Sequence, residues 1–174
     1  FNETNDGAVA VAKASVPTSI SGAKFKYVNG QSTKALSLDG TYGLKLLDDA
    51  SKLGESYTIS FAMKASEAGS AVNPTITAGT FSPEYWLNLT LDGKIWSHDA
   101  NGYIDTTASG AYTAGKWQTV TLVVDGSKQG KTEGTVSGKL YVDGTVVTEG
   151  SVASDIMKKS GAAVYFGVNA WYAY

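Results

Sequence analysis

Two alternating segments meet at an Asp-Gly pair in the stretch Tyr85-Trp86-Leu87-Asn88-Leu89-Thr90-Leu91-Asp92-Gly93-Lys94-Ile95-Trp96-Ser97-His98. Alternation of apolar and polar residues on both sides of such a pair is typical of a β-hairpin. A two-residue loop would pair Leu91 with Lys94 and would leave Ile95 on the face opposite the leucines. That register mixes apolar and polar side chains on both faces of the hairpin.

A three-residue loop from Leu91 to Gly93 separates the two faces. With Gly93 in the left-handed conformation, the strands pair as Thr90 with Lys94, Asn88 with Trp96 and Trp86 with His98. The inner face then carries Leu87, Leu89 and Ile95. The outer face, called the indole face below, carries Trp86, Asn88, Thr90, Lys94, Trp96 and His98. Two indoles beside an amide, a hydroxyl, an ammonium and the only histidine of the chain are typical of a platform for a flat polar ligand such as a sugar ring.

Composition limits the partners that the chain can hold. At 174 residues it has the size of one domain, large enough to bury a core without disulfides. Fourteen basic and 16 acidic residues give a net charge of -2, which argues against nucleic acid and anionic membranes as partners. The absence of cysteine excludes a disulfide framework, a thiolate nucleophile and a sulfur-rich zinc site. A neutral or weakly polar ligand suits this chain better.

Other segments predict further strands and few helices, in keeping with 20 glycines and 3 prolines. Alternation predicts strands over 57–64, with Tyr57, Ile59, Phe61 and Met63 inward, and over 117–125, with Val120, Leu122 and Val124 inward. Shorter strands are predicted over 7–12, 24–27, 35–40, 75–80 and 103–106. A second hairpin over 138–147 is predicted to use an odd loop that pairs Leu140 with Val146 in the interior. One helical turn is expected over 47–54 and a short helix over 151–160. This pattern predicts an all-β sandwich of two antiparallel sheets packed face to face.

Five short motifs in order resemble the laminin-G-like domains of the concanavalin A-like lectin and glucanase superfamily. They are Ala35-Leu-Ser-Leu-Asp-Gly40, Tyr57-Thr-Ile-Ser-Phe61, Gly115-Lys-Trp-Gln-Thr-Val-Thr-Leu-Val-Val-Asp-Gly126, Leu140-Tyr-Val-Asp-Gly144 and Tyr165-Phe-Gly167. The resemblance covers 36–167 and implies a jelly-roll β-sandwich. Bacterial members are modules of secreted glycoside hydrolases or surface adhesins that bind glycans. Such domains usually continue after the Tyr-Phe-Gly strand into a Gly-x-Ile-Asp segment, which does not occur between Gly167 and Tyr174.

Many relatives hold a structural calcium ion with acidic residues of the first strand and of that last segment. In this sequence Asn2, Glu3 and Asp6 match the first part only. The resemblance therefore implies a structural calcium site built on Glu3, although calcium takes six or more oxygen ligands.

The candidate carbohydrate-binding residues are Trp86, Asn88, Trp96, His98, Tyr103 and Trp171. Two alternatives stay open for them. Trp86 and Trp96 could be cross-strand packing partners, because aromatic pairs stabilise hairpins. His98 could be a surface hydrogen-bonding residue, or a general base assisted by Asp99 or Asp105. Trp117 opens a strand where packing explains it better than binding.

The sequence favours a non-catalytic carbohydrate-binding module. The Glu-x-Asp-x-x-Glu arrangement of the superfamily's glucanases occurs nowhere in the chain, so we expect no enzymatic activity. Phe1 in place of methionine, with no apolar run long enough to span a bilayer, favours a single domain over 1–174 that is excised from a longer, processed protein. The resemblance implies that this larger protein is secreted and bacterial. Its expected location is extracellular or at the cell surface, beside neighbouring domains and without membrane insertion. An adhesive domain that docks a protein through the same face, and a glycosidase, are the competing functions.

Overall fold

Strands form nearly all the regular structure of the described residues. The computed structural model describes residues 8–10, 18–19, 26–38, 42–54, 56–66, 72–78, 86–99, 102–127, 136–153 and 163–167. The description of 8–10, 18–19, 26, 42, 72–78, 86, 99, 102 and 103 is limited to the backbone. The predicted positions Glu3 and Trp171 therefore lie outside the described residues.

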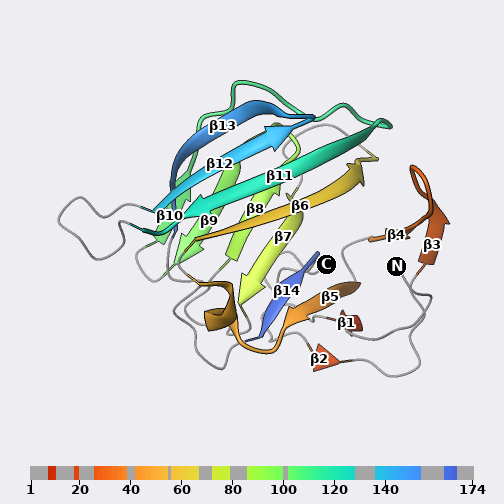
Figure 1. Cartoon of the computed structure of the whole chain (residues 1–174), viewed down its shortest axis with the longest axis horizontal. Coiled ribbons are helices and arrows are strands. Elements are labelled where there is room, and N and C mark those ends of the chain that lie inside the picture. The colour runs from red at the N-terminus through yellow and green to blue at the C-terminus, as the bar shows by residue number, and fades with distance from the viewer. Residues whose placement is uncertain are drawn as a thin grey trace.

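Two antiparallel sheets lie one against the other (Figure 1). The eight-stranded sheet has the spatial order β10 (Gly102–Asp105), β9 (Ile95–Asp99), β8 (Trp86–Thr90), β7 (Val72–Ala78), β14 (Val164–Phe166), β5 (Tyr42–Leu47), β1 (Ala8–Ala10) and β2 (Thr18–Ser19). The four-stranded sheet has the order β13 (Thr145–Val152), β12 (Val136–Val142), β11 (Trp117–Asp125) and β6 (Ser56–Lys64). The predicted sandwich of two antiparallel sheets is confirmed.

Several elements differ from the prediction. A third sheet pairs β3 (Lys26–Asn29) with β4 (Lys34–Ser37) and was not predicted. Strand β5 was missed, and β7 begins at Val72 rather than at Thr75. Strand β13 continues to Val152, so the helix predicted from Ser151 is wrong at its start, and 154–162 lie outside the described residues. The predicted helical turn is the 3-10 helix η1 (Ala50–Leu53), which ends as expected at Gly54 with φ 74°. Glycine is the residue that most readily adopts this left-handed conformation at a helix end.

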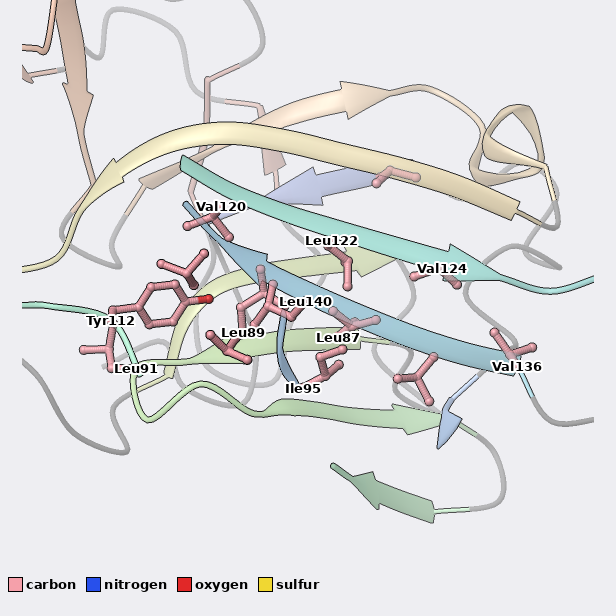
Figure 2. Close-up of a cluster of buried hydrophobic side chains, with 14 of the residues drawn as sticks. Leu87, Leu89, Leu91, Ile95, Tyr112, Val120, Leu122, Val124, Val136 and Leu140 are labelled. Atoms are coloured by element: carbon pink, nitrogen blue, oxygen red, sulfur yellow. The ribbon is translucent and has the colours of Figure 1, made fainter. Parts of the chain in front are cut away.

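The core lies between the two sheets (Figure 2). Six side chains at its centre are at most 1% exposed. They are Leu87, Leu89 and Ile95 from the eight-stranded sheet and Val120, Leu122 and Leu140 from the four-stranded sheet. The inward residues of β6 also pack against this core, as predicted, and Phe61 meets Phe166 of β14 edge to face at 5.2 Å. The apolar alternation of the sequence thus places each of these strands with the expected face inward.

Buried hydroxyl groups join the two sheets beside β10 and β13. The Thr148 hydroxyl lies 2.7 Å from the Thr106 hydroxyl and 2.8 Å from the Thr107 carbonyl oxygen, and Ile95 N–H donates to Thr106 at 2.9 Å. The Ser97 hydroxyl accepts from Ala153 N–H at 2.9 Å. These bonds satisfy polar groups at the place where the sheets approach each other.

The first hairpin adopts the predicted three-residue loop. Trp86 pairs with His98, Asn88 with Trp96 and Leu89 with Ile95, and Thr90 N–H donates to the Lys94 carbonyl oxygen at 3.0 Å. Gly93 has φ 88°, and a Cβ placed on it would overlap the carbonyl oxygen of Gly110. Glycine is therefore required at this position both by its backbone angle and by the close approach of another segment.

The second hairpin contradicts the prediction. Asp143 has φ 50° and Gly144 has φ 80°. Two successive positive values define a two-residue type I′ turn. Val142 then pairs with Thr145 and Tyr141 with Val146, and a bulge follows toward Leu140. Val146 is 39% exposed, and Val147 takes the buried position instead.

Replacing each of the two turn glycines by alanine separates the effect of the left-handed backbone angle from the effect of a steric clash. Gly144→Ala forces a side chain into the left-handed region, although its Cβ would meet no atom within 4 Å. This change is expected to lower the free energy of unfolding by about 1–2 kcal/mol. Gly93→Ala should cost about 1–3 kcal/mol more, because it adds the clash with Gly110. Urea denaturation measures both values, and equal losses would contradict the steric role of Gly110.

The carboxylate of Asp143 fixes the second turn to β11. One of its oxygens accepts from Thr119 N–H at 2.8 Å and the other from the Gln118 side-chain amide at 3.2 Å, with Lys116 Nζ at 3.7 Å. The hydrogen bond from the Thr119 backbone, followed by that from Gln118, holds the pKa of Asp143 below its usual 3.8. The ionised carboxylate is therefore the form that the folded state prefers.

This preference predicts an acid sensitivity that belongs to Asp143. Because the folded-state pKa is lower than the unfolded one, its contribution to stability is present above the unfolded pKa of 3.8 and is lost as the pH falls through the folded pKa. Asp143→Asn, which cannot titrate, should reduce the loss of stability measured by urea denaturation below about pH 4. If the free energy of unfolding of the variant falls with decreasing pH as steeply as that of the parent protein, the prediction is contradicted.

Candidate functional site

The indole face is assembled by the register of β8, β9 and β10. Across these strands Asn88 pairs with Trp96, and Trp96 pairs with Asp105. In the neighbouring row His98 lies between Trp86 and Tyr103. Residues directly opposite in antiparallel strands share one face of the sheet. Five of the six predicted binding positions therefore belong to one face, and the sixth, Trp171, lies outside the described residues.

Burial on this face differs from that of a fully solvated sheet. Trp96 and His98 are half-buried, while Thr90 is buried and Asn88 is 0% exposed. The side chains of Trp86 and Tyr103 are not among those described. The face thus presents the partly exposed side chains of Trp96 and His98 next to the fully buried amide of Asn88.

Both polar atoms of the Asn88 side chain, Oδ1 and Nδ2, are buried without a hydrogen-bond partner. A buried amide that lacks its partners costs about 1–3 kcal/mol of stability. The neighbouring inward positions of the same strand carry Leu87 and Leu89, which are buried at no such cost. An unpaired amide among well-packed neighbours calls for an explanation other than stability.

Charged side chains gather where the hairpin turns. Lys94 Nζ lies 3.6 Å from Asp105 Oδ2 and 4.0 Å from Asp92 Oδ2. Asp92 in turn accepts a hydrogen bond from the Thr90 hydroxyl, and Thr90 Oγ1 accepts from Lys94 N–H at 3.0 Å. The ammonium is therefore held between two carboxylates at one end of the indole face.

The same face continues across the middle of the sheet. Trp86 pairs with Thr77 of β7, Thr77 with Tyr165 of β14, and Tyr165 with Lys45 of β5. Tyr165 is 7% exposed, and this burial raises its pKa. Lys45 Nζ lies 2.8 Å from Asp48 Oδ1, and this pair raises the pKa of Lys45 and lowers that of Asp48. Sequence reasoning did not assign Tyr165 to this face. The alternation of Tyr165 with the inward-facing Val164 and Phe166 on the same strand was a signal for it.

Two other residues considered in the sequence, Asp105 and Trp117, have contacts that point to other roles. Asp105, considered as a helper for His98, makes an ion pair with Lys94 and is the register partner of Trp96. Trp117 lies on the four-stranded sheet with Lys64 Nζ 5.8 Å from its ring centroid. This cation–π contact agrees with a packing role for Trp117.

A metal site has no support among the described residues. Within that part of the chain, no three histidine or acidic side chains lie close enough together to hold a metal ion. The calcium site at Glu3 falls outside it and remains a prediction.

Membrane insertion through a helix has no support in the described part of the chain either. None of its helices has the length and apolar character needed to cross a bilayer.

The fold and the indole face define a two-sheet jelly-roll β-sandwich with an aromatic and polar sheet face. A laminin G family model, described as the concanavalin A-like lectin/glucanases superfamily, matches residues 38–174, and the chain belongs to this family. Among curated protein sequences none matches this chain. A similar solved structure is domain 4 of AbnA, a GH43 extracellular arabinanase from Geobacillus stearothermophilus, in complex with arabinotriose. The TM-score is 0.66 at 21% identity, over 92% of this chain and 72% of that one, and this likeness supports the fold alone.

The cost of burying Asn88 can be measured directly. Asn88→Leu removes the unpaired amide and keeps a side chain of similar size, so the free energy of unfolding is expected to rise by about 1–3 kcal/mol. For a domain of this size, the melting temperature should rise by roughly 2–4 °C for each kcal/mol gained. Asn88→Asp, which places a charge in the same site, is the opposing control and should destabilise strongly. A stability loss in Asn88→Leu would show that the amide is already satisfied.

Proposed function

We propose that this chain is a non-catalytic carbohydrate-binding module that attaches a larger secreted protein, a glycoside hydrolase or a surface protein, to a polysaccharide or glycan. The binding site is the indole face with Trp86, Trp96 and His98 at its centre. Asn88, Tyr103 and Trp171 flank these residues. In this proposal Trp96 stacks on the apolar face of a sugar ring, and the polar side chains around it bind the hydroxyl groups.

The observation that carries the proposal is the unpaired Asn88 amide beside a half-buried tryptophan. A side-chain amide has two donors and two acceptor lone pairs, which suits the neighbouring hydroxyl groups of a sugar. None of the Asn88 surface is exposed, so contact with a ligand requires the atoms that cover it to move, as interface side chains commonly do on binding. Ligand binding would then satisfy the group whose burial destabilises the free protein.

Two further facts support a glycan as ligand. The family to which the chain belongs is named for lectins and glucanases, and the similar AbnA domain was solved with arabinotriose. The Glu-x-Asp-x-x-Glu arrangement that serves glucanases as nucleophile and acid is absent from the sequence. Together these facts favour binding over hydrolysis, and the extracellular location follows from the proposed role.

Removing the central indole tests the proposal. A sugar ring that covers about 100 Å² of indole gains about 2.5 kcal/mol, so Trp96→Ala should weaken binding on the order of 50-fold. Affinity electrophoresis through gels that contain arabinan or other plant polysaccharides provides the first measurement. Isothermal titration calorimetry with arabinotriose and longer oligosaccharides then gives the dissociation constants.

Trp117→Ala is the matched control, because this tryptophan is also half-buried but lies on the other sheet. It is expected to leave glycan binding unchanged. Binding that survives Trp96→Ala together with Trp86→Ala would reject the indole face as the site. Capture of a protein ligand with no retention by any polysaccharide would favour the adhesive alternative.

A further inference from the structure

Among the described residues, one lysine of the indole face and one of its continuation each form ion pairs with carboxylates. Lys94 lies between Asp105 at 3.6 Å and Asp92 at 4.0 Å. Lys45, in the row of Tyr165, contacts Asp48 at 2.8 Å. Three carboxylates thus stand against two ammonium groups, which leaves these described ion pairs with an excess of negative charge. The excess of negative charge at these pairs disfavours an anionic ligand beside them.

Of the carboxylates that pair with Lys94, Asp105 is the one that lies next to the partly exposed Trp96. It lies directly opposite Trp96 in the β9–β10 ladder, at the distance where cross-strand side chains interact. Its side chain is 49% exposed, and one of its oxygens, Oδ2, faces Lys94. An ionised carboxyl group accepts several hydrogen bonds, so the contact with Lys94 leaves acceptor capacity for a ligand.

Asn88 provides an independent indication of a ligand in the same row. It lies on the other side of Trp96, fully buried and without a hydrogen-bond partner for either polar atom. The row Asp105, Trp96 and Asn88 covers two interstrand spacings, about 10 Å. The central indole is thus flanked by a carboxylate acceptor on one strand and an amide on the other.

We propose that the ligand of the indole face is a neutral polyhydroxyl chain, and that Asp105 binds its hydroxyl groups beside Trp96. Lys94 orients Asp105, and its own charge is offset by Asp105 and Asp92, so it does not recruit acidic sugars. Charge-assisted hydrogen bonds from hydroxyl groups to Asp105 add affinity for a neutral sugar. A uronate or sulfate group in the same place would be repelled by Asp105, and Lys94 does not compensate because it already pairs with Asp105 and Asp92. This inference rests on the proposed function and specifies its ligand.

Calorimetry with two classes of probe tests the inference. The neutral probes are arabinan and other uncharged polysaccharides, and the acidic probe is polygalacturonate. The parent protein should bind a neutral probe more tightly than polygalacturonate, with an affinity that does not change between about 0.05 M and about 0.5 M NaCl. Asp105→Asn should weaken neutral binding by about 10-fold, as expected for the loss of a charged acceptor.

Releasing Lys94 from its carboxylates should reverse the preference. The double variant Asp92→Asn with Asp105→Asn is expected to gain affinity for polygalacturonate, and this gain should disappear at high salt. Glu149→Gln is the matched control, because Glu149 also pairs with a lysine, Lys139, but on the four-stranded sheet. It should change neither affinity.

The outcomes separate this inference from the proposed function. If Trp96→Ala weakens binding but Asp105→Asn binds like the parent protein, the glycan site stands and the role of Asp105 is wrong. Tighter binding of polygalacturonate than of every neutral probe by the parent protein would overturn the inference in the same way. If no probe binds, or if Trp96→Ala changes nothing, the proposed function itself fails and the inference fails with it.

Discussion

The close approach of Gly93 to the carbonyl oxygen of Gly110 is the constraint on which the indole face depends. The segment that carries Gly110 also binds the hairpin loop, because Tyr112 N–H donates to the Leu91 carbonyl oxygen at 3.4 Å. This contact leaves no room for a side chain at Gly93, which is the left-handed residue of the three-residue loop. The loop sets the register, and the register decides that Leu87 and Ile95 face the core while Asn88 and Trp96 face away. A shift by one residue would exchange the faces and remove the site.

The two Asp-Gly hairpins show where sequence reasoning succeeds and where it fails. In the first, apolar residues on both strands agree with one register only, so the alternation was enough to predict the loop. In the second, the same argument chose Val146 as the buried partner, but the structure buries Val147 through a bulge. There Asp143 and Gly144 adopt the two-residue type I′ turn that Asp-Gly pairs favour, and bonds from Thr119 and Gln118 hold the Asp143 carboxylate. These partners lie 24 and 25 positions away along the chain, so no local pattern reveals them.

The strands that sequence predicted well are those with an unbroken alternation, such as β6 and β11. Strand β5, Tyr42-Gly-Leu-Lys-Leu-Leu47, lacks that pattern, and it is recognised in the structure by its pairing with β1 and β14. The buried bonds between Thr106 and Thr148 join residues 42 positions apart and give no sequence signal. Local pattern therefore predicted the sandwich and most of its strands. Long-range pairing decided strand β5 and the links between the sheets.

The candidate site follows the same division. Register could be predicted, so the positions of Trp86, Asn88, Trp96, His98 and Tyr103 on one face were predictable from the hairpin and its neighbour. Burial could not be predicted, because it depends on neighbours from several segments, and Asn88 was expected on an open surface. Its sealed, unpaired amide strengthens the functional argument, because a residue selected only for packing would be apolar at this position. The energetic cost of Asn88 in the free protein is therefore the feature that most clearly connects the fold to binding.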